Sequence, residues 1–361
     1  MRTRALLFLP LSIACGDASP AGDAESFGPA STDDTAPATT SSAGGSDDSP
    51  ATTSSASTTT SSATSNAESS EASDDGSSSA DDSGDAPLPV HECESPQPEW
   101  VFCSDFEEGN KDIWDDYDGN PDETNLLVED PGPFDNAGNH AMQFIVPAGR
   151  NGVDLVKELP GDVDRLYARW FIQWEPGFDF DAPNHGGGLH AGSRDWLGHS
   201  DTRPYGDDWY TGWIDYDSTL HRSYIYSYYA GMYMDCVDPQ GQCWGDHLPC
   251  MVDEGENYCT NPDHRETVEP PQLETGRWYC IEIMLDGGTA SADGAGATGA
   301  LDFWVDGVEI GPWTDLWMRT TSELRPNILW LSLFHHEEHS VAGIRYDHVV
   351  VSTDRIGCGG S

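Results

Sequence analysis

The sequence predicts an all-β fold, a two-sheet antiparallel jelly-roll sandwich of the concanavalin A-like lectin and glucanase type, placed after a disordered N-terminal segment. Many short stretches alternate apolar and polar residues with a period of two. The 38 Gly and 24 Pro residues separate these stretches with turn signals. No stretch shows the 3.6-residue repeat of a long amphipathic helix. Numerous short strands with turns between them are typical of sandwiches.

The first 14 residues are expected to be a signal peptide. Arg2 and Arg4 precede an apolar run, 5–13, that is too short to span a bilayer. The run ends in Leu11-Ser12-Ile13-Ala14-Cys15, which resembles a bacterial lipobox with Cys15 as the lipidated residue. Ordinary cleavage by signal peptidase is the alternative. We therefore expect an exported lipoprotein of the bacterial outer membrane or cell surface, or alternatively a periplasmic or secreted protein.

Residues 15–90 are expected to form a disordered linker. Ser, Thr, Ala, Gly, Asp and Glu dominate this segment, which cannot bury enough apolar surface to offset its ordering entropy. Such a tether would hold the folded domain, 91–361, roughly 50 Å from its anchor. The lipid would then be the protein's only contact with the membrane.

Charge and cysteines limit the classes of function. The chain has 64 Asp and Glu against 16 Lys and Arg, so it lacks the basic stripe of a nucleic-acid-binding protein. Eight cysteines follow Cys15, an even number that indicates disulfides in an exported chain. We expect the group from Cys236 to Cys259 to bridge its own loop, and an N-terminal cysteine to pair with Cys358. None of the cysteine spacings is the Cys-x-x-Cys of a zinc site, so structural zinc is not expected.

Alternation locates the main strands. The clearest are 277–285 and 301–305, which we expect to form a hairpin, with the Gly- and Ser-rich segment 286–299 between them too polar to order itself firmly. The stretch 175–203 is interpreted as turn-rich. The remaining strands are expected at 102–107, 141–146, 153–159, 165–174, 222–230, 327–334 and 343–351.

Two strands carry unusual side chains for a solvated sheet. Arg169 and Gln173 share one side of 165–174 with aromatics, and Arg222 shares one side of 222–230 with Tyr224, Tyr226 and Tyr228. Pyranose rings stack on aromatic faces while their hydroxyls bind Arg, Gln and Tyr. We therefore expect the two strands to lie side by side on a curved sheet and to line a carbohydrate cleft. The alternative is that the tyrosines only pack beneath the cysteine-rich segment that follows.

A family resemblance joins these features. Tyr224-Ile225-Tyr226, Gly276-x-Trp278, Gly299 to Gly307 (Gly-Ala-Leu-Asp-Phe-Trp-Val-Asp-Gly), Arg319, Phe334 and Asp347 are similar to the concanavalin-type jelly roll of polysaccharide lyase families 20 and 14, which include glucuronan and alginate lyases. The resemblance covers about 92–357. It implies a concave sheet that holds an acidic polysaccharide for β-elimination.

That reaction needs a group that neutralises the uronate carboxylate, a base and an acid. The resemblance implies that Tyr224 or Tyr226 serves as base or acid. Residue chemistry adds Arg169, Gln173 and Arg222 for the carboxylate and His190 as a base. His335 and His336 are expected in a histidine-rich loop beside the cleft.

Three other chemistries have partial signatures in the sequence. Asp105 and Glu107 on the first strand would meet Asp347 on the last if the chain ends pair, which predicts a structural Ca²⁺ site of the kind related jelly rolls hold, with solvated edge carboxylates as the alternative. The run 335–339 matches His-x-x-Glu-His, but that zinc motif needs a helix. The Glu-x-Asp-x-Glu run of retaining glucanases is absent, and 214–217 is its nearest approach.

The sequence thus predicts a monomeric, surface-tethered protein whose partner is a polysaccharide. It is either a lyase or a non-catalytic glycan-binding or adhesive module, and a structural surface protein is the third alternative.

Overall fold

The computed structural model describes residues 91–117, 124–182, 184–233, 243–250, 268–336 and 341–359. These residues form two antiparallel sheets, which confirms the predicted sandwich. Helical structure among them is limited to two 3₁₀ turns, η1 (Glu92–Glu94) and η2 (Arg194–Trp196). None of their helices is long and apolar enough to cross a membrane. The predicted signal peptide, Cys15 and the linker lie outside the described residues.

Sheet 1 has nine strands. Its order is β13 (Val308–Glu309), β12 (Gly299–Val305), β11 (Trp278–Asp286), β6 (Arg165–Trp174), β16 (Ile344–Ser352), β4 (His140–Phe144) and β3 (Asn125–Glu129), with β1 (Trp100–Ser104) on β16 and β14 (Trp313–Leu316) on β12.

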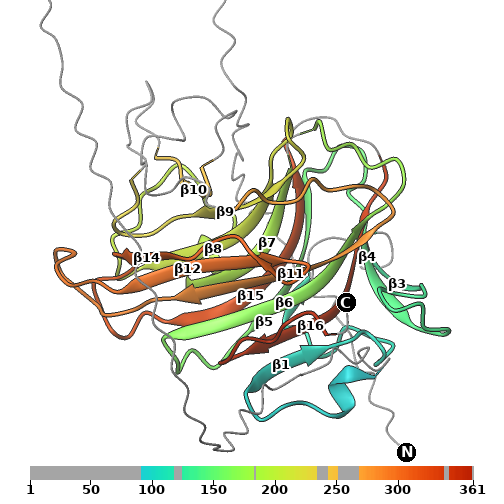
Figure 1. Cartoon of the computed structure of the whole chain (residues 1–361), viewed down its shortest axis with the longest axis horizontal. Helices are drawn as coiled ribbons and strands as arrows, with labels where there is room; N and C mark the ends of the chain where they lie inside the picture. Colours follow the sequence, from blue (N-terminus) through green and yellow to red (C-terminus); the bar gives the residue numbers. More distant parts are fainter. Residues whose placement is uncertain are drawn as a thin grey trace, which may run out of the picture. The chain divides into compact units, whose positions relative to one another are not determined.

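Sheet 2 has seven strands. Its order is β10 (Asp246–Leu248), β9 (Ser223–Ser227), β8 (Trp209–Tyr216), β7 (Asn184–Gly192), β15 (Pro326–His335), β5 (Gly152–Glu158) and β2 (Asp116–Tyr117). The sheets face each other, since β11 contacts β7 and β8, and β15 contacts β6 (Figure 1).

Alternation along the strands builds the core. Trp170 and Ile172 of β6 and Ile281 and Ile283 of β11 are fully buried between the sheets, where they pack with residues of sheet 2 such as Ile214. Each such side chain contributes about 1.5–3 kcal/mol when it leaves water. The strand predicted at 277–285 is confirmed as β11.

Two local predictions are wrong. The stretch taken as turns contains β7, because its glycines pair within a strand. The segment 286–299, expected not to order itself, is held by neighbours: the Trp317 indole N–H donates to the Ser291 carbonyl at 2.7 Å, and Ser291 N–H donates to the Arg319 carbonyl at 3.1 Å.

The disulfides also differ from the prediction. Cys358 pairs with Cys280 of β11, and Cys93 pairs with Cys103, so no N-terminal cysteine reaches the C-terminus. The chain ends meet instead through β1, which pairs with β16. Cys243 and Cys250 are also disulfide-bonded, whereas Cys236 and Cys259 lie outside the described residues.

Candidate active site on sheet 2

One face of sheet 2 gathers aromatic and titratable side chains from five strands. Cross-strand partners share a face, and the register sets two rows across the sheet. The first row is His247, Tyr226, Trp213, Gly188 and Trp330. The second row is Tyr224, Asp215, His185 and Phe334. We call the side chains of these two rows the aromatic face.

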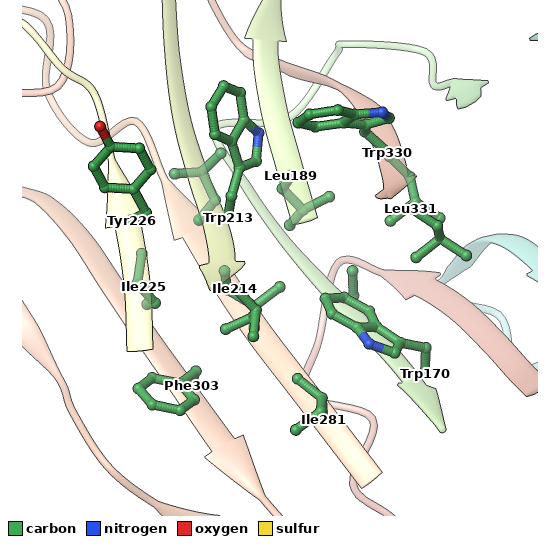
Figure 2. Packing of buried hydrophobic residues seen from close by; sticks show 14 of the residues in the cluster. Trp170, Leu189, Trp213, Ile214, Ile225, Tyr226, Ile281, Phe303, Trp330 and Leu331 are labelled. Atoms are coloured by element: carbon green, nitrogen blue, oxygen red, sulfur yellow. The ribbon is translucent and has the colours of Figure 1, made fainter. Parts of the chain in front are cut away.

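The aromatic face points away from sheet 1. Figure 2 shows Tyr226, Trp213 and Trp330 on one side of sheet 2, while Ile214 and Leu331 project from the other side toward sheet 1. This follows from the period of two, because neighbouring residues of a strand alternate between the core and the opposite face. The alternation predicted along 222–230 is confirmed, but Tyr224, Tyr226 and Tyr228 are buried, with Gly245 and His247 packed against the first two, so the expectation that they line an open cleft is wrong.

Glycines in β7 allow the strands beneath this face to pack closely. A Cβ on Gly187 would lie 1.9 Å from the Trp330 carbonyl oxygen, and one on Gly188 would lie 2.3 Å from that of Gly212. The register also shifts between His185 and Gly188. With no side chain at Gly188, the rings of Trp213 and Trp330 meet edge to face, their centroids 5.0 Å apart.

His185 is the centre of the polar contacts on the aromatic face. Its Nδ1 pairs with the Asp215 carboxylate, and its Nε2 faces Nε2 of His336. A carboxylate only accepts hydrogen bonds, so Nδ1 of His185 donates to it, and Nε2 of His185 accepts from Nε2–H of His336. Burial, together with the nearby His185, lowers the pKa of His336 to about 3, so His336 is neutral at neutral pH.

Tyr226 lies against this group. Its ring stacks on His185 with centroids 5.8 Å apart, and its hydroxyl is 2.6 Å from that of Tyr228. The Gly245 N–H also donates to it, at 3.3 Å. Burial, and next the neighbouring Tyr228, raise the pKa of Tyr226 well above its usual value. The Tyr226 hydroxyl therefore stays protonated and suits a proton donor.

Access to the aromatic face is uneven. Tyr226 is only 8% exposed, Tyr224 is buried against the His247 ring at 4.5 Å, and Tyr228 is fully buried. The side chain of His185 is 28% exposed, and Phe334 and His336 are half-buried. Solvent therefore reaches the face at the corner formed by His185, His336 and Phe334.

The predicted arginine strand does not join this face. Arg169 belongs to β6 in sheet 1, where its Nη2 donates to Glu92 at 2.6 Å and its side chain is buried. Gln173 lies on the same strand and donates to the Gly276 carbonyl. The expectation that β6 and β9 lie side by side is wrong, since β6 pairs with β11 and β16. Arg222 precedes β9 and forms an ion pair with Glu269.

Two predicted histidines are placed where a polymer does not reach them. His190 is fully buried, stacked between Trp209 and Trp213 at 6.1 and 6.4 Å, and burial lowers its pKa to about 3. His335 is buried beside Phe178, on the side of β15 opposite to Phe334. Of His335 and His336, the described histidines of the predicted loop, His336 lies at the accessible corner.

The three predicted metal ligands do not converge. Asp105 accepts hydrogen bonds from the N–H groups of Cys93 and Glu107, and Glu107 accepts from His140. Asp347 is buried, which raises its pKa to about 7, and it accepts from Asn139 Nδ2 at 2.8 Å. Within the described ranges no three His, Cys, Asp or Glu side chains form a metal-binding group.

Sequence reasoning missed five residues of the aromatic face: His185, Trp213, Asp215, His247 and Trp330. Asp215 was noticed only as part of an incomplete glucanase motif. The signal that could have found β8 is the alternation of Trp209, Thr211, Trp213 and Asp215 along it. His185 was hidden because glycines follow it, which favoured a turn.

No protein-family model and no curated protein sequence matches this chain. Similar solved structures include the alginate lyase vAL-1 from Chlorella virus (13% identity, 71% of this chain and 100% of that one, TM-score 0.49). The PL-14 alginate lyase from Aplysia kurodai is also similar (11%, 71% and 97%, 0.48), as is the endo-β-1,4-glucuronan lyase from Trichoderma reesei (13%, 67% and 91%, 0.40). At these identities the likeness concerns the fold alone.

Proposed function

We propose that the aromatic face of sheet 2 binds a polysaccharide and cleaves it by β-elimination, with His185 as the base and Tyr226 as the acid. The observation that carries the proposal is the orientation of His185. Asp215 holds its Nδ1–H, which places its Nε2 lone pair on Nε2 of His336 at the accessible corner, where a substrate could take the place of His336, and the ring stacks on Tyr226.

His185 and Tyr226 together account for both proton transfers of the elimination. His185 Nε2 removes the proton from the carbon next to the uronate carboxylate, and the C–H electrons form a double bond as the C–O bond to the leaving sugar breaks. Tyr226 protonates the leaving oxygen, since its raised pKa keeps it a donor. The Asp215 carboxylate stabilises the imidazolium that forms, as the buried carboxylate of a catalytic triad does.

The aromatic face suits a sugar ring at its open corner. Phe334 is half-buried beside His185, with ring centroids 6.0 Å apart. Such a ring offers a surface for the C–H face of a pyranose. The face contains no arginine, so the carboxylate of the substrate would be met by histidine.

Burial of the tyrosines favours a second candidate, a glycan-binding module without catalysis. Tyr224, Tyr226 and Tyr228 are 8% exposed or less, and a sugar bound only at the His185 corner would be held without reaching the Tyr226 hydroxyl.

One experiment separates the two candidates. The full chain is incubated with alginate, glucuronan and a neutral glucan, and the unsaturated product is followed by its ultraviolet absorbance. A lyase releases product from a uronate polymer only, and His185→Ala, Asp215→Asn and Tyr226→Phe each reduce the rate by about 10²–10⁴-fold. Tyr205→Phe is the matched control, because Tyr205 is 78% exposed outside this face.

Product formation unaffected by all three variants would reject this assignment of roles. Retention of the polymer on the protein without any product would instead support the binding module.

Export and lipidation of Cys15 remain part of the proposal. Metabolic labelling with a fatty acid should mark the wild-type chain, and Cys15→Ser should lose the label. A labelled Cys15→Ser chain would argue against this anchor.

A further inference from the structure

A polar cleft lies apart from the aromatic face, at one end of sheet 1. It has a volume of about 660 Å³ and is lined by the start of β6, the loop between β11 and β12, and the segment before β15. This volume is within the range of small-molecule sites. Its lining shares no residue with the aromatic face.

Three arginines line this cleft, in a chain whose formal net charge is −48. They are Arg165, Arg319 and Arg325. Two aspartates, Asp164 and Asp286, are the acidic residues of the lining. The lining therefore has three guanidinium groups and two carboxylates, and Glu323 lies close to Arg325, so an anionic group would be held by individual guanidinium donors rather than by a net positive charge.

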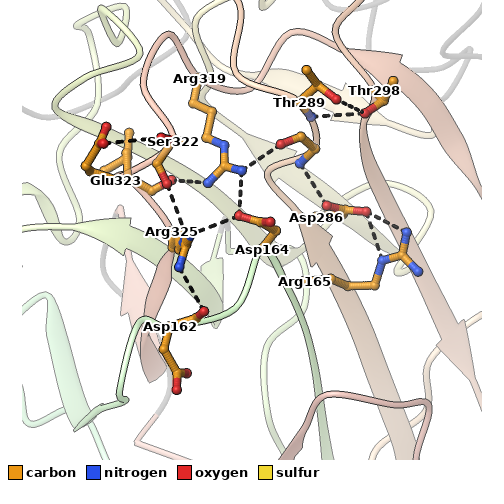
Figure 3. A network of polar contacts seen from close by, with 12 residues as sticks. Asp162, Asp164, Arg165, Asp286, Thr289, Thr298, Arg319, Ser322, Glu323 and Arg325 are labelled. Carbon is orange, nitrogen blue, oxygen red and sulfur yellow. Dashed lines mark hydrogen bonds and ion pairs between the residues drawn. The ribbon is translucent and has the colours of Figure 1, made fainter.

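The aspartates hold the guanidinium groups in place. Asp164 accepts from Arg319 at 2.6 Å and pairs with Arg325 at 3.2 Å, and Asp286 accepts from Nε and Nη2 of Arg165 at 2.8 and 2.6 Å (Figure 3). Gly288 N–H donates to the other oxygen of Asp286 at 2.8 Å. Arginines fixed in this way lose little side-chain entropy when they bind a ligand.

Donors remain for a ligand. Arg325 uses Nε and Nη1 for the carbonyls of Ser322 and Asp162, and its Nη2 has no hydrogen-bond partner among the described residues. The side chains of Arg165 and Arg325 are 52% and 35% exposed. Arg319 is buried, and its Nε also lacks a partner in the described part of the chain.

Hydroxyl groups complete the lining. Thr289, Thr298, Ser322 and Thr353 stand around the arginines. A guanidinium matches a carboxylate in geometry and charge, and hydroxyl side chains exchange hydrogen bonds with sugar hydroxyls.

We propose that this cleft is a second glycan site, which binds a single sugar unit that carries a carboxylate. The carboxylate lies between Arg165 and Arg325, and the sugar hydroxyls meet the threonine and serine side chains. The volume of the cleft, about 660 Å³, suits one uronate unit, such as a chain end, rather than a continuous polymer. The site does not depend on lyase activity at His185.

The test is a calorimetric titration of the full chain with methyl β-D-glucuronide and with methyl β-D-glucoside, which lacks the carboxylate. The glucuronide should bind at least tenfold more tightly. Arg165→Gln and Arg325→Gln should each weaken glucuronide binding about tenfold or more, because each removes a charged donor.

Arg277→Gln is the matched control, since Arg277 is 54% exposed and pairs with Asp306 elsewhere. Equal affinity for the two sugars, no measurable binding of the glucuronide, or an equal loss in Arg277→Gln would overturn the proposal. Circular dichroism of each variant shows that it is folded, and two independent arginines keep the test valid if one variant fails to fold.

Two further variants distinguish this site from the aromatic face. His185→Ala should bind the glucuronide with unchanged affinity in the cleft. Arg165→Gln should keep any lyase rate of the wild-type chain. If His185→Ala instead abolishes glucuronide binding, the sugar binds on sheet 2 and the cleft is not its site.

Discussion

Arg169 and Glu92 form a buried ion pair that joins the N-terminal segment to the middle of sheet 1. The Arg169 guanidinium donates to Glu92 at 2.6 Å, and the same carboxylate oxygen lies 3.1 Å from His348 Nδ1. Burial raises the pKa of Glu92, but the attraction of Arg169 and the hydrogen bonds of Arg169 and His348 together outweigh it, so the pKa lies below its usual value. Arg169, which was expected to neutralise the carboxylate of a substrate, therefore stabilises the fold instead.

Removing one partner of this pair leaves a buried charge uncompensated. Arg169→Ala should lower the free energy of unfolding by about 3–5 kcal/mol, as measured by chemical denaturation. The control Arg277→Ala removes an exposed pair and should cost about 1 kcal/mol or less. Similar losses in the two variants would show that Arg169 is not held as described.

His190 gives the protein a specific sensitivity to acid. Burial between two tryptophans lowers its pKa to about 3, whereas in the unfolded chain it titrates near the ordinary value of about 6.5. Between these values the unfolded chain binds a proton that the folded chain does not, so the free energy of unfolding falls as the pH falls below 6.5.

This contribution reaches about 1.4 kcal/mol per pH unit. The unfolding free energy of His190→Gln should therefore depend less steeply on pH between 6.5 and 4 than that of the wild-type chain. Parallel curves from denaturation at several pH values would contradict the assigned burial of His190.

At the scale of elements, β7 shows why glycine misled the interpretation of the sequence. Gly186 to Gly188 are typical of a turn, yet here they pair with β8 and β15 at distances that exclude a side chain. Glycine serves both uses, a tight turn and a close approach of strands. The sequence alone does not distinguish them, and the misassigned strand carries His185.

Because β7 lies so close to its neighbouring strands, a side chain added to it should destabilise the protein strongly. Gly187→Ala would place a methyl group 1.9 Å from the Trp330 carbonyl oxygen and should lower the unfolding free energy by at least about 3 kcal/mol. Gly109→Ala is the control, with open space around the added atom and a φ of +70°, which should cost about 1–2 kcal/mol. A mild effect of Gly187→Ala in thermal denaturation would show that the strands are less tightly paired.

Period-two alternation was enough to find most strands and their buried sides. The predicted strand 165–174 coincides with β6, and the face of β9 that carries Tyr224 and Tyr226 was assigned correctly. These are local properties. Which strands pair is not determined by the local sequence, because several pairings of β6 would satisfy the same alternation. The actual pairing decides whether Arg169 lies near the tyrosines of β9.

At the scale of the whole molecule, the two sheets separate two kinds of chemistry. Sheet 2 presents histidine, aspartate and aromatic rings, while one end of sheet 1 presents arginines paired with aspartates. The sequence predicted a carbohydrate-binding surface but combined residues of both sheets in one cleft. Composition and charge bear on the class of partner, whereas the location of each site depends on strand order.

The proposed sugar site is the His185 corner of the aromatic face. The most direct measurement is a titration of the full chain, labelled at its histidine rings, with a uronate tetrasaccharide, followed by nuclear magnetic resonance. The imidazole signals of His185 and His336 should shift to saturation, while those of His140, which pairs with Glu107 beside sheet 1, should stay in place. Bound tetrasaccharide that leaves the His185 and His336 signals unmoved would contradict the claim.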